Sequence, residues 1–135
     1  MTGTPFIGLY PFQWIALITA VLTVLLVADA LAGHYRSGFA FRSQYAPFAA
    51  PLLAVFASLW IVLAPSRAAL VALSILLWLT FLTGFVGLGM HLRGFSRQMG
   101  GLYVTVFNWL EGPPAFAPAL FAGFAAVGLV TIYLL

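Results

Sequence analysis

Two histidines are the residues of this sequence best suited to holding a ligand. His91 follows Thr83 and Gly87 at four-residue spacing, so a helix would place all three on one stripe. A histidine nitrogen beside small residues is what a flat macrocycle needs, because the ring requires room next to its axial ligand. His34, with Ala30 one turn before it, ends a hydrophobic segment that runs in the same direction. The pair indicates a haem b or (bacterio)chlorophyll site, with His91 as the main ligand and His34 as the weaker candidate.

The same small residues support a second interpretation. Glycine stripes in membrane helices provide close helix packing more often than they make room for a cofactor. A histidine at a helix end can also anchor that end at the membrane surface, and on this alternative the histidines bind nothing. The expected packing positions are Gly84, Gly87, Gly89, Ala119 and Gly123.

Asp29 is the most informative charged residue, because it lies about one helical turn inside the end of the first hydrophobic segment. Burying a carboxylate in a membrane is costly, so we expect Asp29 to face the other helices and to pair with Arg36 or Arg93. A proton relay is less favoured, because no series of polar side chains continues across the membrane from Asp29. We therefore predict a structural polar cluster at one end of the helices, with the members Asp29, Arg36, Arg93, Arg97, Asn108 and Glu111.

The sequence carries no recognisable catalytic or metal-binding motif. It has no nucleophile–base pair, phosphate-binding loop, zinc signature or dinucleotide fingerprint, and it contains no cysteine. A metal site made of Asp29, Glu111 and the two histidines would lack the paired Glu-x-x-His spacing of di-iron helical bundles. We therefore predict neither catalysis nor a metal centre.

The composition shows what kind of scaffold must position these side chains. Of the 135 residues, 64% are hydrophobic and only 5% are charged, whereas soluble domains are about 45–50% apolar and about 25% charged. A soluble domain of this size could not bury so much apolar surface, and the 16% aromatic content excludes a disordered chain. The chain is therefore expected to be an integral membrane protein. Its few scattered arginines form no basic stripe, so no nucleic acid partner is expected.

Four hydrophobic segments predict an all-α membrane fold with four transmembrane helices, because about 20 helical residues cross a bilayer core. A fifth apolar run, 102–110, is too short to span and is expected to lie in the interface or to re-enter before the last helix. The expected spans cover residues 11–33, 47–64, 68–90 and 113–135 within a single domain, 1–135.

The arginines predict the orientation of these spans. The connections 34–46 and 91–112 lie on one side and carry Arg36, Arg42, Arg93 and Arg97, whereas Arg67 is alone on the opposite side. Short loops rich in arginine stay in the cytoplasm. We therefore expect both termini to face outward, in a multi-pass protein of the bacterial inner membrane.

One longer pattern is similar to a known group of proteins. It comprises His91-Leu92-Arg93-Gly94, Gly100-Gly101, Asn108 and the run Gly-Pro-Pro-Ala-Phe-Ala-Pro-Ala-Leu-Phe at 112–121. This pattern resembles an uncharacterised family of small four-span bacterial inner-membrane proteins. The resemblance covers residues 91–121 and implies the four-span fold, but it brings no activity.

Three functions are compatible with these features. The absence of catalytic groups, the apolar surface and the packing stripes favour an accessory, non-catalytic subunit of a larger energy-converting membrane complex. Such a complex would be photosynthetic (reaction-centre or light-harvesting) or respiratory, and the chain would pack against other subunits, lipids or pigments. The alternative is a small haem- or pigment-binding anchor for electron transfer or a quinone site, using His91 and His34. The third is a small transporter or channel component.

Overall fold

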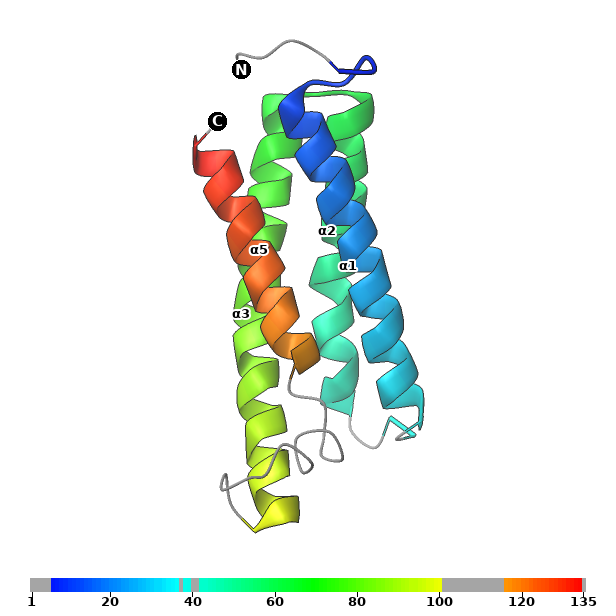
Figure 1. The fold of residues 1–135 in the computed structure, drawn as a ribbon, viewed down its shortest axis with the longest axis vertical. Coiled ribbons are helices and arrows are strands. Elements are labelled where there is room, and N and C mark those ends of the chain that lie inside the picture. The colour runs from blue at the N-terminus through cyan, green and yellow to red at the C-terminus, as the bar shows by residue number, and fades with distance from the viewer. Residues whose placement is uncertain (1–5, 37, 40–41, 101–115, 135) are drawn as a thin grey trace.

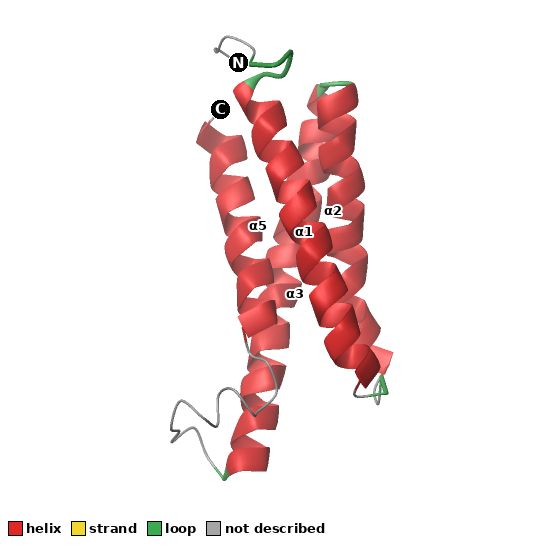
Figure 2. Cartoon of the chain, turned by 45° about the vertical axis from the view of Figure 1, so that its right-hand side comes forward, coloured by secondary structure: helices red, strands yellow, loops and turns green. Residues whose placement is uncertain are grey.

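A computed structural model of the chain describes residues 6–36, 38–39, 42–100 and 116–134. These residues form four α-helices and one short 3₁₀ helix, with no β-strand among them (Figures 1 and 2). In chain order the elements are α1 (Pro11–Arg36), η1 (Arg42–Tyr45), α2 (Ala46–Leu63), α3 (Arg67–Met99) and α5 (Phe116–Leu134). The predicted all-α class is confirmed for this part of the chain.

Three of the described helices have the length and composition of membrane spans. The qualifying stretches are Pro11–Arg36, Arg67–Gln98 and Ala117–Leu134. The expected second span corresponds to α2, whose apolar part Pro47–Leu63 is shorter. The expected interfacial segment 102–110 and the residues 113–115 of the expected fourth span lie outside the described residues.

The four helices form an elongated bundle in which each helix packs against two neighbours (Figure 1). α2 packs between α1 and α3, and α5 packs mainly on α3 and less extensively on α1. The turn between α2 and α3 is tight because the Oγ of Ser66 accepts a hydrogen bond of 3.2 Å from the backbone N–H of Ala69. This N-cap starts α3 immediately after Pro65, so α2 and α3 form an antiparallel hairpin.

α3 is longer than the third span expected from hydropathy, which ends at residue 90. The helix continues through His91, Arg93 and Arg97 to Met99. Gly100 follows as the C-cap, and its φ of 75° is the left-handed conformation typical of that position. Hydropathy marks where the apolar stretch ends, whereas nothing between His91 and Met99 stops a helix. Arg93 and Arg97, which were expected in the connection 91–112, are therefore helical.

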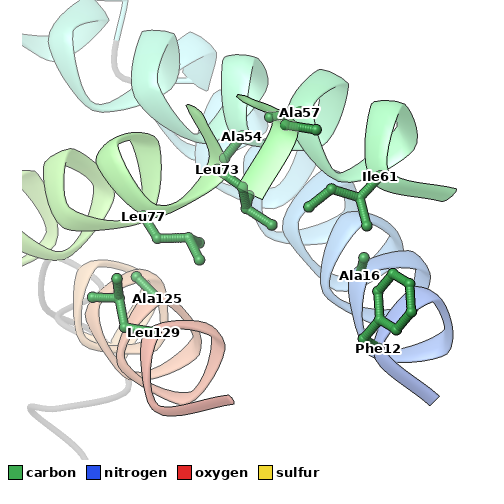
Figure 3. Close-up of a cluster of buried hydrophobic side chains, with 10 residues drawn as sticks. Phe12, Ala16, Ala54, Ala57, Ile61, Leu73, Leu77, Ala125 and Leu129 are labelled. Atoms are coloured by element: carbon green, nitrogen blue, oxygen red, sulfur yellow. The ribbon is translucent and has the colours of Figure 1, made fainter. Parts of the chain in front are cut away.

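The core of the bundle is built from side chains of all four helices, mainly alanines and branched aliphatic residues together with Phe12 (Figure 3). Only 22%, 28% and 33% of the most apolar windows of α1, α3 and α5 are buried within the chain. Many large apolar side chains of these helices are exposed instead, among them Leu25, Val86 and Val127, which is the reverse of a soluble bundle. The main core cluster comprises Phe12, Ala16, Ala54, Ala57, Ile61, Ala69, Leu73, Leu77, Ala125 and Leu129.

Candidate functional site

The rings of His34 and His91 lie together at the end of the bundle where α1 ends and α2 begins. Their centres are 6.0 Å apart and their planes are 78° apart. His34 comes from the last turn of α1 and His91 from α3, two helices that lie diagonally across the bundle rather than side by side. The two histidines singled out from the sequence therefore share one site, and both are half-buried.

Aromatic rings enclose His34 on other sides. The ring of Phe48 on α2 lies edge-on at 5.7 Å, and that of Phe39 lies at 5.9 Å. Phe39 is stacked on Tyr45 at 4.5 Å, with planes 4° apart, and its backbone N–H donates a hydrogen bond of 3.1 Å to the carbonyl oxygen of His34. We call His34, Phe39, Tyr45, Phe48 and His91 the histidine–aromatic cluster.

Sequence reasoning missed the aromatic members of this cluster. Phe39 and Tyr45 lie in the connection between the first two hydrophobic segments, and their stacking depends on how that connection folds back onto α1. Phe39 has a φ of 45°, a conformation uncommon for residues other than glycine. No sequence pattern predicts that conformation. The density of aromatic residues in 39–48 was the only available signal.

Asp29 lies on the outside of the bundle rather than facing the other helices. Val27 is buried, and Asp29 follows it by about 200° around a helix of 3.6 residues per turn. Within the described residues, Asp29 is exposed and forms no ion pair with Arg36 or Arg93, which are exposed as well. The pairing expected from the sequence is therefore not present.

The other members of the predicted polar cluster are divided between described and undescribed residues. Arg36 ends α1, and Arg93 and Arg97 lie in the last turns of α3, all exposed. Asn108 and Glu111 lie outside the described residues. In the described part of the chain, no group of three or more histidine, cysteine or acidic side chains is close enough to hold a metal ion.

The expected packing positions differ in what surrounds them. A Cβ atom at Gly84 would lie 2.8 Å from the backbone nitrogen of Ala122 and 2.9 Å from the carbonyl oxygen of Pro118, and one at Gly87 would lie 3.3 Å from Pro118 Cβ. α3 and α5 thus approach closely at these glycines. Ala119 is half-buried on α5, whereas Cβ atoms at Gly89 and Gly123 would meet nothing within 4 Å.

Two further features lie toward the opposite end of the bundle. The hydroxyl group of Tyr133 on α5 lies 3.3 Å from the Oγ of Ser74 and accepts a hydrogen bond of 3.3 Å from the indole N–H of Trp78. A cavity of about 60 Å³ lies between the helices, with a mainly apolar lining that includes Phe12, Leu77 and Gly128. It does not reach the histidine–aromatic cluster, because none of its lining residues belongs to that cluster.

Comparison with known proteins finds no family model, no curated protein and no solved structure that matches this chain. A functional assignment therefore rests on the residues described above. Two features of the site bear on it directly: the paired histidines inside one end of the bundle, and the exposed carboxylate of Asp29 outside it.

Proposed function

We propose that this chain is an accessory, non-catalytic subunit of a larger energy-converting complex in the bacterial inner membrane. The outward-facing apolar side chains of α1, α3 and α5 support insertion in a bilayer. The four arginines at one end of the bundle support a cytoplasmic position for that end, with α1 starting and α5 ending on the outside.

The single observation that carries the subunit role is the exposed side chain of Asp29. A carboxylate on the outside of a membrane helix is costly unless a partner compensates it, and Asp29 has no arginine partner in the described residues. Three of its neighbours on the surface of α1 are small and exposed: Ala28, Ala32 and Gly33. Small residues let another helix approach closely. This face of α1 suits a partner helix that carries a basic side chain near the cytoplasmic surface.

Purification from native membranes in a mild detergent tests this role. We expect the chain to leave the membrane in a particle much larger than its own 14.5 kDa, together with other membrane proteins in fixed proportion. Recovery of the chain as a stable, isolated monomer from its native membrane would contradict the proposal.

A second candidate is a small haem- or pigment-binding anchor for electron transfer or a quinone site. The observation that favours it is the 6.0 Å separation of the His34 and His91 rings, since two imidazoles can hold one haem iron from opposite faces. An absorption spectrum of the natively purified chain tests it, and the absence of a Soret or chlorin band would exclude it. No described polar pathway favours the third function, transport.

A further inference from the structure

We infer that His34 and His91 form a binding site for a single transition-metal ion, held directly by the two imidazoles. Imidazole nitrogens suit Cu²⁺, Ni²⁺ and Zn²⁺, and these two rings come from different helices to one place. The inference goes beyond the subunit role and does not depend on it. It also departs from the sequence analysis, in which the spacing of the ionisable residues predicted no metal centre.

The distance between the rings fits one shared ion. With metal–nitrogen bonds of about 2.0–2.1 Å and ring nitrogens about 1.1 Å from the ring centre, two imidazoles on a tetrahedral ion have centres about 5.2 Å apart. The same bonds give about 6.3 Å when the two imidazoles lie opposite each other across the ion. The observed 6.0 Å falls between these values, so the ring centres already lie at a separation that one shared ion requires. The 78° angle between the planes is no obstacle, because a bound imidazole can rotate about its metal–nitrogen bond.

The surroundings of His34 favour an ion over a macrocycle. The rings of Phe39 and Phe48 lie within 5.9 Å of the His34 ring, and Phe48 is buried in a small core cluster with Val27 and Phe121. A porphyrin or chlorin ligated by His34 would extend many atoms sideways from the metal and would have to displace these rings. A single ion would leave them in place.

The site would offer two protein ligands and leave the other coordination positions open. No third histidine or acidic side chain joins the pair among the residues that the structure describes, so water or a small exogenous ligand would complete the coordination. A bound ion would also connect α1 to α3 across the bundle. Binding to the folded state alone would therefore raise the stability of the chain.

Titration of the full chain with Cu²⁺ alone tests this inference. The protein is purified in detergent through an affinity tag that contains no histidine and is stripped of metal before use. We expect one Cu²⁺ per chain, an electron paramagnetic resonance spectrum with nitrogen hyperfine splitting, and a higher midpoint of thermal unfolding. Cu²⁺ is the best first probe because it binds nitrogen ligands more tightly than the other divalent ions of its row.

His34→Gln and His91→Gln are the test variants, and Arg42→Gln, an exposed residue at the same end of the bundle, is the matched control. Each histidine variant should weaken Cu²⁺ binding at least tenfold and abolish the thermal shift, while the control binds like the wild type. Circular dichroism of each variant shows whether it still folds. If a histidine variant fails to fold, diethyl pyrocarbonate labelling of the wild type replaces it, and Cu²⁺ should protect both histidines.

Two outcomes would overturn the inference. Binding that is unchanged in both variants, or histidines that stay equally reactive with and without Cu²⁺, would place the ion elsewhere. A macrocycle that co-purifies with the wild-type chain and is lost in the His34→Gln variant would assign the pair to the second candidate function instead. Neither outcome would affect the subunit role, which depends on the outer face of α1.

Discussion

The side-chain amide of Gln13 on α1 donates a hydrogen bond of 2.9 Å to the carbonyl oxygen of Val62 on α2, and its oxygen accepts one of 2.9 Å from the backbone N–H of Tyr10. Val62 lies in the last turn of α2, where carbonyl groups lack partners within the helix. Tyr10 directly precedes α1, so Gln13 reaches back as the third residue of a capping box does. One buried side-chain amide thus supplies a hydrogen-bond partner at the start of α1 and another at the end of α2.

Replacing Gln13 by Leu should therefore destabilise the bundle. The variant leaves the Tyr10 N–H and the Val62 carbonyl group without these partners, at a cost of about 1–3 kcal/mol in the free energy of unfolding. Thermal unfolding in detergent, followed by circular dichroism, measures the effect. Leu25→Met, at an exposed position of the same helix, is the control. Equal stability of Gln13→Leu and wild type would show that the amide does not join the helices.

Gly84 and Gly89 form a second matched pair. Gly84→Ala places a methyl group against the backbone of α5, 2.8 Å from the nitrogen of Ala122, so the helices must separate, at a cost of about 1–3 kcal/mol. Gly89→Ala meets nothing within 4 Å on the same helix and should leave stability unchanged or raise it by up to roughly 1 kcal/mol. The same unfolding measurement compares the two variants. A Gly89→Ala variant that is less stable than Gly84→Ala would refute the close contact between α3 and α5.

Gly128 should tolerate alanine better than Gly84 does, although its new Cβ atom would lie 2.9 Å from Leu77 Cδ1. The contact is with the end of a flexible side chain, and both residues line the cavity of about 60 Å³. Leu77 can therefore rotate into free space, and we expect a cost below about 1.5 kcal/mol. A Gly128→Ala variant as unstable as Gly84→Ala would mean that Leu77 cannot move and that the cavity is not available to it.

Much of the fold follows from patterns that are local in the sequence. Hydropathy located α1, α3 and α5. The cap that starts α3 is equally local, because Ser66 needs only its own neighbours to form it. His34 and His91 were expected to reach one plane near one membrane face, and their rings do lie together in the structure.

The rest depends on how the helices are rotated, which hydropathy does not determine. Asp29 was expected to face the bundle, where it could form an ion pair with an arginine. Val27 occupies the inward face of α1 instead. The length of α3 was underestimated because helical polar residues beyond a span look like a loop in a hydropathy profile. The aromatic rings around His34 depend on the positive φ of Phe39, and that backbone conformation cannot be predicted from the residue type.

Asp29→Asn should weaken the attachment of this chain to its partner. If the carboxylate pairs with a basic side chain, its loss should lower the amount of co-purified partner roughly tenfold, equivalent to about 1.4 kcal/mol. Quantitative immunoblotting of the mild-detergent extract measures this. Asp29→Glu, which keeps the charge, should retain most of the partner. A loss that is equal in both variants, or absent from both, would show that the charge does not hold the partner.

The most direct test of the subunit role is a density map of the complex purified from native membranes. The account predicts a transmembrane helix of another subunit against Ala28, Ala32 and Gly33, with an arginine or lysine side chain next to Asp29. A map in which the chain contacts no other subunit, and this face of α1 contacts only lipid, would contradict the subunit role.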